Sequence, residues 1–259
     1  TGKGVTIALI DGEVDTSAPE LTGADITDKS PCTVTSSMRT KTHGTAMASL
    51  LVARDYGISP NAKILAYRLT LPAEGDSSGT DCQNTAGIRK DTVPSLINAA
   101  INDGAQIITI SSSNEGGTDP LKWAMARAVS QGIIITAATG NNAKNETDVS
   151  YEKWSGVIGV TAIDTDGNFQ DYSSWGEGVV SAAIGGPEKF ATTQPDRLPL
   201  SAAHPSQLPS SLALSRSPAR SGPRPPRISS FSSSFTRGPT RTTRGISTRA
   251  TAASRPARW

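Results

Sequence analysis

The run Val5-Thr6-Ile7-Ala8-Leu9-Ile10-Asp11 carries the strongest structural signal in this chain of 259 residues. Its apolar, largely β-branched residues follow Gly4 and end on an acid, which is typical of a strand buried on both faces of a sheet. Four further runs have the same character: Ile64–Tyr67, Ile107–Ile110, Ile133–Ala138 and Val157–Thr161. The sequence therefore predicts a sheet whose strands are buried on both sides.

Helical patterns alternate with these strands. They cover His43–Ala53, Pro94–Asn102 and Leu121–Ser130. Alternation of strand and helix predicts an α/β fold, a parallel sheet with helices on both faces. In such sheets functional residues collect on loops beyond the carboxyl ends of the strands, so we look for candidates directly after each strand.

A change of composition divides the chain near Asp196. Residues 1–196 contain 14 Lys and Arg and all 23 Asp and Glu, whereas residues 197–259 contain 11 Arg and no acid. In the second segment Ser, Arg and Pro account for 34 of 63 residues and Leu, Ile, Val and Phe for only 9, which is typical of disorder. We expect a globular domain over residues 1–196 and a disordered tail over residues 197–259. No run of about 18 apolar residues occurs, which argues against a membrane-spanning helix.

Asp11 and His43 are the first candidates for catalysis. Asp11 ends a buried strand, and His43 opens a predicted helix whose next residues are small enough for close packing on the sheet. An imidazole oriented by a carboxylate can serve as a general base for a nucleophile. Each residue also has a structural alternative, because Asp-Gly is a common turn signal and a single histidine at a helix start is often solvated.

Four blocks of residues follow one another along the chain. They are Val5–Asp11 with Pro19-Glu20-Leu21, then His43-Gly44-Thr45-Ala46-Met47-Ala48, then Ala137-Ala138-Thr139-Gly140-Asn141, then Tyr172-Ser173-Ser174-Trp175-Gly176. Over residues 4–193 their order resembles that of the subtilisin-like serine proteases, the subtilases. The resemblance implies a serine endopeptidase with an Asp-His-Ser triad, a peptide or protein substrate, and a secreted or cell-surface location. No signal peptide is recognisable in the chain, which begins at Thr1.

The resemblance assigns the catalytic roles to Asp11, His43 and Asn141. Asn141 would donate a side-chain hydrogen bond to the developing oxyanion, with the neighbouring Asn142 as an alternative. The acidic loop after the first strand leaves two questions open. Asp15 is a rival for the carboxylate role, and Glu13 could raise the pKa of the imidazole or could simply be a solvated loop acid.

Ser111, Ser112 and Ser113 are the expected substrate-binding positions. In the family the corresponding segment has a Ser-Leu-Gly-like sequence and pairs with the extended substrate, and here only Ser111 agrees with it. Pairing through the backbone does not depend on the side chain, so strand addition by a peptide stays the expectation. Loss of the glycine could narrow the specificity pocket, and no preferred substrate side chain is predicted.

The serine of the triad is absent from its expected place. The family carries a Gly-Thr-Ser-x-Ala-Ala-Pro block at the start of a long central helix, and no such string occurs after Gly176. Across Ala202–Pro209, codons read from the third base of one residue and the first two of the next admit Gly, Thr, Ser, Phe, Ala, Ala and Pro. The next six shifted codons, through Ser215, admit Leu, Val, Ala, Gly, Ala and Val. We therefore expect a frameshift between Gly185 and Leu200, with the tail translated out of frame.

A chain without this serine and its helix is expected to be inactive and incompletely folded. Two other functions stay open: a non-catalytic peptide-binding remnant, and a basic tail that binds nucleic acid or an acidic partner through charge. Only Phe231, Phe235 and Trp259 offer rings for base stacking in the tail, which argues against nucleic acid.

No metal or other cofactor is predicted. Structural calcium is common in the family, but no calcium block can be matched here. Asp164, Asp166 and Asn168 resemble a calcium-loop string without its closing Glu, so a turn is the better interpretation. Cys32 and Cys82 both fall in predicted loops, and the sequence leaves open whether they form a disulfide or two free thiols.

Overall fold

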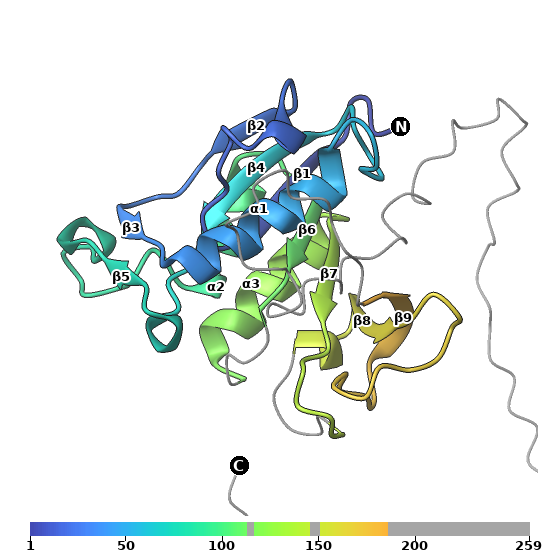
Figure 1. Ribbon diagram of the computed structural model, residues 1–259. Helices are drawn as coiled ribbons and strands as arrows, with labels where there is room; N and C mark the ends of the chain where they lie inside the picture. The colour runs from blue at the N-terminus through green and yellow to red at the C-terminus, as the bar shows by residue number, and fades with distance from the viewer. Residues whose placement is uncertain (113–116, 146–150, 186–259) are drawn as a thin grey trace, which may run out of the picture. The chain divides into compact units, whose positions relative to one another are not determined.

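The computed structural model of the protein describes residues 1–112, 117–145 and 151–185 (Figure 1). At its centre is a seven-stranded sheet in the order β2-β4-β1-β6-β7-β8-β9, in which every neighbouring pair is parallel. Its strands are β1 (Thr6–Asp11), β2 (Asp25–Asp28), β4 (Lys63–Arg68), β6 (Ile107–Ile110), β7 (Ile134–Ala138), β8 (Val157–Ile163) and β9 (Val179–Ile184). The predicted α/β fold with a parallel sheet is confirmed. The predicted boundary at Asp196, the tail and the shifted codons lie outside the described residues.

Helices cover both faces of this sheet, as predicted. They are α1 (Met38–Val52), α2 (Val93–Asn102) and α3 (Asp119–Ser130). The central strand β1 divides its side chains between two cores because successive residues of a strand point to opposite faces. Ile7 and Leu9 pack with α1, whereas Ala8 and Ile10 pack with α2 and α3. β1 is thus buried on both sides, and its last residue is held rigidly at the carboxyl edge of the sheet.

The start of α1 differs from the prediction. The helix begins at Met38, so His43 lies in its second turn and does not open it. Ser37 caps the helix, and its hydroxyl accepts a hydrogen bond from the Thr40 amide at 3.2 Å. The first turn is polar apart from Met38, and Met38 is 74% exposed. This turn therefore adds nothing to the apolar pattern on which the prediction of the helix start was based.

A long excursion links β4 to α2 and leaves the main sheet. It contains the 3-10 turns η2 (Pro72–Glu74) and η3 (Thr80–Cys82) and the short strand β5 (Ser77–Ser78). β5 pairs antiparallel with β3 (Val34–Thr35) in a small second sheet beside the start of α1 (Figure 1). A disulfide joins Cys82 of η3 to Cys32, which answers the question that the sequence left open.

The buried residue Asp91 fixes the far end of this excursion. Its carboxylate accepts hydrogen bonds from the hydroxyls of Thr70 and Ser78, both at 2.5 Å, and from the guanidinium of Arg89 at 2.6 Å. Burial raises the pKa of Asp91, but these donors outweigh it and bring the pKa down to about 2. The excursion is therefore anchored by a charged group as well as by the disulfide. Among the described residues no helix is long and apolar enough to cross a membrane.

Candidate active site

Asp11 is the last residue of β1 and lies in the middle of the carboxyl edge of the sheet. Its partner in the neighbouring strand β4 is Arg68, and the residue before it, Ile10, pairs with Ile110 of β6. The side chain is only 6% exposed. Its Oδ1 accepts a hydrogen bond from the Gly12 amide at 2.6 Å, and its Oδ2 is buried without a hydrogen-bond partner among the described residues. The carboxylate is therefore fixed in one orientation.

His43 reaches this carboxylate from the second turn of α1. Its Nδ1 lies 2.7 Å from Asp11 Oδ1, and its side chain is 21% exposed. Because a carboxylate only accepts hydrogen bonds, Nδ1 carries the proton and Nε2 is left as the basic nitrogen of the neutral ring. Burial lowers the pKa of His43, but the charge and hydrogen bond of Asp11 outweigh it, so that the pKa lies above its ordinary value of 6.5.

Two glycines allow the helix to approach the end of β1 so closely. A Cβ atom on Gly12 would lie 2.2 Å from the carbonyl oxygen of Thr40, and one on Gly44 would lie 2.6 Å from the carbonyl oxygen of Gly12. Real Cβ atoms do not approach that closely, so neither position accepts a side chain without movement of the backbone. The contact sets the distance from α1 to β1 and thereby the distance from His43 to Asp11.

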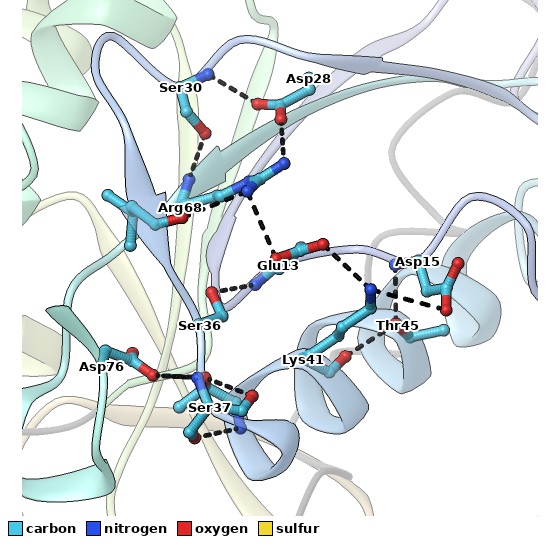
Figure 2. Close-up of polar contacts among 12 residues, drawn as sticks. Glu13, Asp15, Asp28, Ser30, Ser36, Ser37, Lys41, Thr45, Arg68 and Asp76 are labelled. Atoms are coloured by element: carbon cyan, nitrogen blue, oxygen red, sulfur yellow. Dashed lines mark hydrogen bonds and ion pairs between the residues drawn. The ribbon is translucent and has the colours of Figure 1, made fainter. Parts of the chain in front are cut away.

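Glu13 is not a solvated loop acid, which corrects one of the two interpretations above. Its carboxylate bridges two cations, with Oε1 3.1 Å from Lys41 Nζ and Oε2 3.3 Å from Arg68 Nη1 (Figure 2). Arg68 also pairs with Asp28 at 2.6 Å. Glu13 therefore ties the loop after β1 to α1 and to β4. Nothing in the sequence signals these pairs, because their members are far apart in the chain.

Asp15, the rival carboxylate, points to other partners. Its Oδ1 accepts hydrogen bonds from the amide and hydroxyl of Ser17, at 3.1 and 2.5 Å, and its amide donates to the hydroxyl of Thr45. The structure thus brings Asp11, and not Asp15, to His43.

Asn141 follows β7, the fifth strand of the sheet. β6 separates β7 from β1, so the residues after Ala138 lie on the same carboxyl edge as Asp11. The hydroxyl of Thr139 donates to the carbonyl of Ser174 at 3.0 Å, and the amide of Ser174 donates to the carbonyl of Gly140 at 2.9 Å. These two bonds join the Tyr172–Gly176 block to the segment that carries Asn141. The catalytic role of Asn141 stays a prediction.

Ser111 and Ser112 lie directly after β6, the strand between β1, which ends at Asp11, and β7, which precedes Asn141. Their hydroxyls are buried and have no hydrogen-bond partner among the described residues. Ser113, the third expected substrate-binding position, lies outside the described residues. Two of the three positions are thus placed on the predicted edge, and their pairing with a peptide stays a prediction.

The string Asp164, Asp166 and Asn168 forms a turn between β8 and the residues that follow. Asp164 accepts hydrogen bonds from the amides of Asp166 and Asn168 and from the Asn168 side chain, at 2.9, 2.7 and 2.9 Å. The carboxylate is used by the turn itself, in line with the interpretation from the sequence.

Comparison with known proteins adds an independent line of observation. Residues 2–209 match the sequence profile of the subtilase family, a range that extends past the predicted boundary at Asp196. The chain is 30% identical over 188 residues to the thermophilic serine proteinase of Bacillus sp. (strain AK1), covering 67% of this chain and 42% of that protein. It is 27% identical over 184 residues to subtilisin E of Bacillus subtilis (strain 168), covering 68% of this chain and 45% of that protein.

Solved structures give the same result for the fold. A mutant of the protease domain of PatA superposes with a TM-score of 0.57 and 26% identity, over 71% of this chain and 68% of that chain. A cold adapted subtilisin-like serine proteinase superposes with a TM-score of 0.55 and 21% identity, over 71% of this chain and 64% of that chain. The matched region spans less than half the length of each of the two curated relatives named above.

Proposed function

The chain belongs to the subtilase family, and on that premise we propose that residues 1–185 carry the aspartate and histidine of a serine endopeptidase. One observation carries the proposal: His43 Nδ1 lies 2.7 Å from the buried Asp11 carboxylate at the carboxyl edge of a parallel sheet. This is the orientation of imidazole and carboxylate that prepares a serine hydroxyl for attack on an amide.

In the proposed reaction Asp11 holds the His43 ring with its proton on Nδ1. The free Nε2 takes the proton of the serine hydroxyl as that hydroxyl attacks the peptide carbonyl, and later returns it to the leaving amine. Asp11 stabilises the positively charged ring that forms between these steps. The raised pKa of His43 means that the base is half protonated at a pH above 6.5, so activity should rise with pH through that region.

Asn141 and the serines after β6 complete the proposed site. The Asn141 amide donates to the oxygen of the carbonyl under attack, where negative charge develops. The backbone of Ser111 and Ser112 pairs with an extended peptide substrate, which adds a strand beside the site. The partner is therefore a peptide or protein substrate, and the chemistry is carried by side chains without a cofactor.

The nucleophile belongs to the part of the gene that we infer to be out of frame. The shifted codons across Ala202–Pro209 admit the family's serine block, and the written frame does not contain it. The chain as written is accordingly inactive. Loss of the serine in subtilisin lowers the turnover number by about 2 × 10⁶, which is the scale of the expected defect.

Export of the protein is part of the same proposal. The Cys32–Cys82 disulfide supports it, because disulfides persist mainly in oxidising compartments outside the cytosol.

Two versions of the protein test the proposal. The gene is first sequenced across the codons for Gly185 to Pro209, and both the written chain and a frame-restored chain are then purified and incubated with an unspecific protein substrate such as casein. We expect hydrolysis by the frame-restored chain only, abolished by His43→Ala and by a serine-directed fluorophosphonate. An inactive but folded frame-restored chain would refute the assignment, and hydrolysis by the written chain would refute the frameshift.

A non-catalytic peptide-binding protein is the second candidate, favoured by the missing serine block. It predicts that the written chain binds unstructured peptides without turnover. Isothermal titration of the written chain with casein-derived peptides tests this candidate. Binding without hydrolysis supports it, and a folded chain that does not bind contradicts it.

A further inference from the structure

Asp76 is a buried carboxylate at the beginning of α1 that the proposed reaction does not use. It comes from the excursion between β4 and α2 and is 6% exposed. Its Oδ1 accepts a hydrogen bond from the Ser37 amide at 2.8 Å (Figure 2). Oδ1 also accepts from the Thr40 hydroxyl at 2.6 Å, while Oδ2 accepts from the Leu71 amide at 3.0 Å. Both oxygens are therefore engaged, and they join the excursion to the first turn of the helix.

A negative group at this place stabilises the helix, and the first turn of α1 supplies none of its own. The amino-terminal end of a helix carries partial positive charge and unpaired amides, which favour a negative group nearby. The first turn of α1 contains no acidic residue, and Ser37 satisfies only the Thr40 amide. Asp76 supplies the charge from a distant part of the chain and in addition fixes where the helix begins.

Thr40 connects this anchor to the active site. Its hydroxyl donates a hydrogen bond to Asp76, and its carbonyl oxygen lies 2.2 Å from the position that a Cβ atom on Gly12 would take. The amide of Gly12 in turn donates to Asp11 Oδ1, the oxygen that also meets His43. A movement of Thr40 therefore changes the packing of Gly12 and the position of the ring one turn further along α1.

We propose that Asp76, acting through Thr40, is a positioning residue that fixes α1 on the end of β1 and so holds His43 at hydrogen-bond distance from Asp11. The inference rests on the proposed function only in treating this pair as catalytic. The position of the ring can be measured without any turnover, so the two can fail separately.

The decisive variant is Thr40→Val, which removes one hydroxyl at nearly constant shape and changes no charge. We expect the pKa of His43 to fall relative to the wild type, because a longer distance to Asp11 weakens the interaction that raises it. The pKa is read from an NMR titration of the His43 ring protons, with the resonance of His204 identified by His204→Gln. Asp76→Ala should give a larger fall, and Asp76→Asn, which keeps an acceptor, a smaller one.

The effect of Thr40→Val on the pKa of His43 has to be separated from the effect of other charged groups near the ring. Besides Asp11, the pKa of His43 responds to Arg39 and Glu74, which pair with each other at 2.8 Å. Glu74 belongs to the same excursion as Asp76, so the Thr40→Val titration is repeated in a Glu74→Gln background, where the same fall is expected. A fall that disappears in that background would assign the effect to Glu74 and overturn the proposal.

Asp91→Asn is the matched control for stability. Asp91 is a buried acid that anchors the same excursion, and its hydrogen-bond partners Thr70, Ser78 and Arg89 do not belong to α1. It should destabilise the protein and leave the His43 titration unchanged. If folded Thr40→Val titrates like the wild type, Asp76 only stabilises the fold and the proposal is wrong. In an active frame-restored enzyme, Thr40→Val should lower kcat by about tenfold or more with little change in KM.

Discussion

Replacing Asp11 by Asn tests the electrostatics of the site most directly. The substitution keeps the size of the side chain and removes the charge that faces His43. In the wild type the two groups are 2.7 Å apart, and their side chains are 6% and 21% exposed. The pair is therefore largely buried and poorly screened by solvent.

The size of the effect follows from this geometry. Two opposite charges about 4 Å apart attract one another by about 4 kcal/mol at an effective dielectric constant of about 20, and breaking a buried pair typically costs about 3–5 kcal/mol. We expect Asp11→Asn to lower the free energy of unfolding by about 3 kcal/mol where His43 is protonated. Where the ring is neutral only a hydrogen bond is lost, which costs about 1 kcal/mol.

The direction of the pH dependence is fixed by the raised pKa of His43. A group whose pKa is higher in the folded state binds its proton more tightly there, so its contribution to stability is complete below the unfolded pKa of about 6.5. That contribution is lost as the pH rises through the folded value. The difference between wild type and Asp11→Asn should therefore be largest near pH 5.5 and smallest near pH 9.

Urea unfolding of the frame-restored chain and of its Asp11→Asn variant, at half-unit intervals between pH 5.5 and pH 9, measures this difference. Asp164→Asn provides the control, because Asp164 lies on an exposed turn away from the pair and its variant should show no pH trend in this range. A loss of stability that is constant with pH, or greater at pH 9 than at pH 5.5, would refute the assignment of a charged His43–Asp11 pair.

Three further predictions concern the surroundings of the site. Gly12→Ala should lower the free energy of unfolding by about 2–3 kcal/mol, because its Cβ meets Thr40, and a thermal melt equal to the wild type would contradict that packing. Replacing Cys32 and Cys82 together by Ser should cost about 4 kcal/mol from the 50-residue separation of the disulfide, and the variant's melting temperature should no longer respond to reductant. Asp91→Asn should destabilise the protein at pH 7, and in acid titrations followed by circular dichroism its deficit should shrink as the pH falls from about 4 towards 2, because the wild type loses the contribution of a depressed pKa there.

The interior of the sheet could be predicted from the sequence because its strands are buried on both faces. β6 was predicted with its observed bounds, Ile107–Ile110, since nothing but apolar and β-branched residues fits there. The outer strands β2 and β9 were missed for the opposite reason. β2 has acids at both ends, and Val180 of β9 is 70% exposed, so neither strand shows the continuous apolar pattern of a buried one.

The candidate site was predictable where it depends on position at a strand end and not where it depends on contacts across the chain. Asp11 is recognisable because a buried strand stops on it. Asp76 is not, because it lies in a polar segment without periodicity and bonds to Thr40, 36 positions away in the chain. Thr40 illustrates the difficulty, because its hydroxyl contacts Asp76 and its carbonyl oxygen packs against Gly12. A threonine in the polar first turn of a helix gives no sequence signal for either contact.

The order of the strands bears on how the protein is made. Once β4 has paired with both β2 and β1, β6 adds to the free edge of β1, and β7, β8 and β9 then add in turn, each to the strand before it. Among the described strands, β4 alone lies between two that were synthesised earlier, β2 and β1. The loss of frame proposed above falls after Gly185, by which point all seven described strands have been synthesised and, from β6 onwards, each has a free sheet edge to join as the nascent chain emerges.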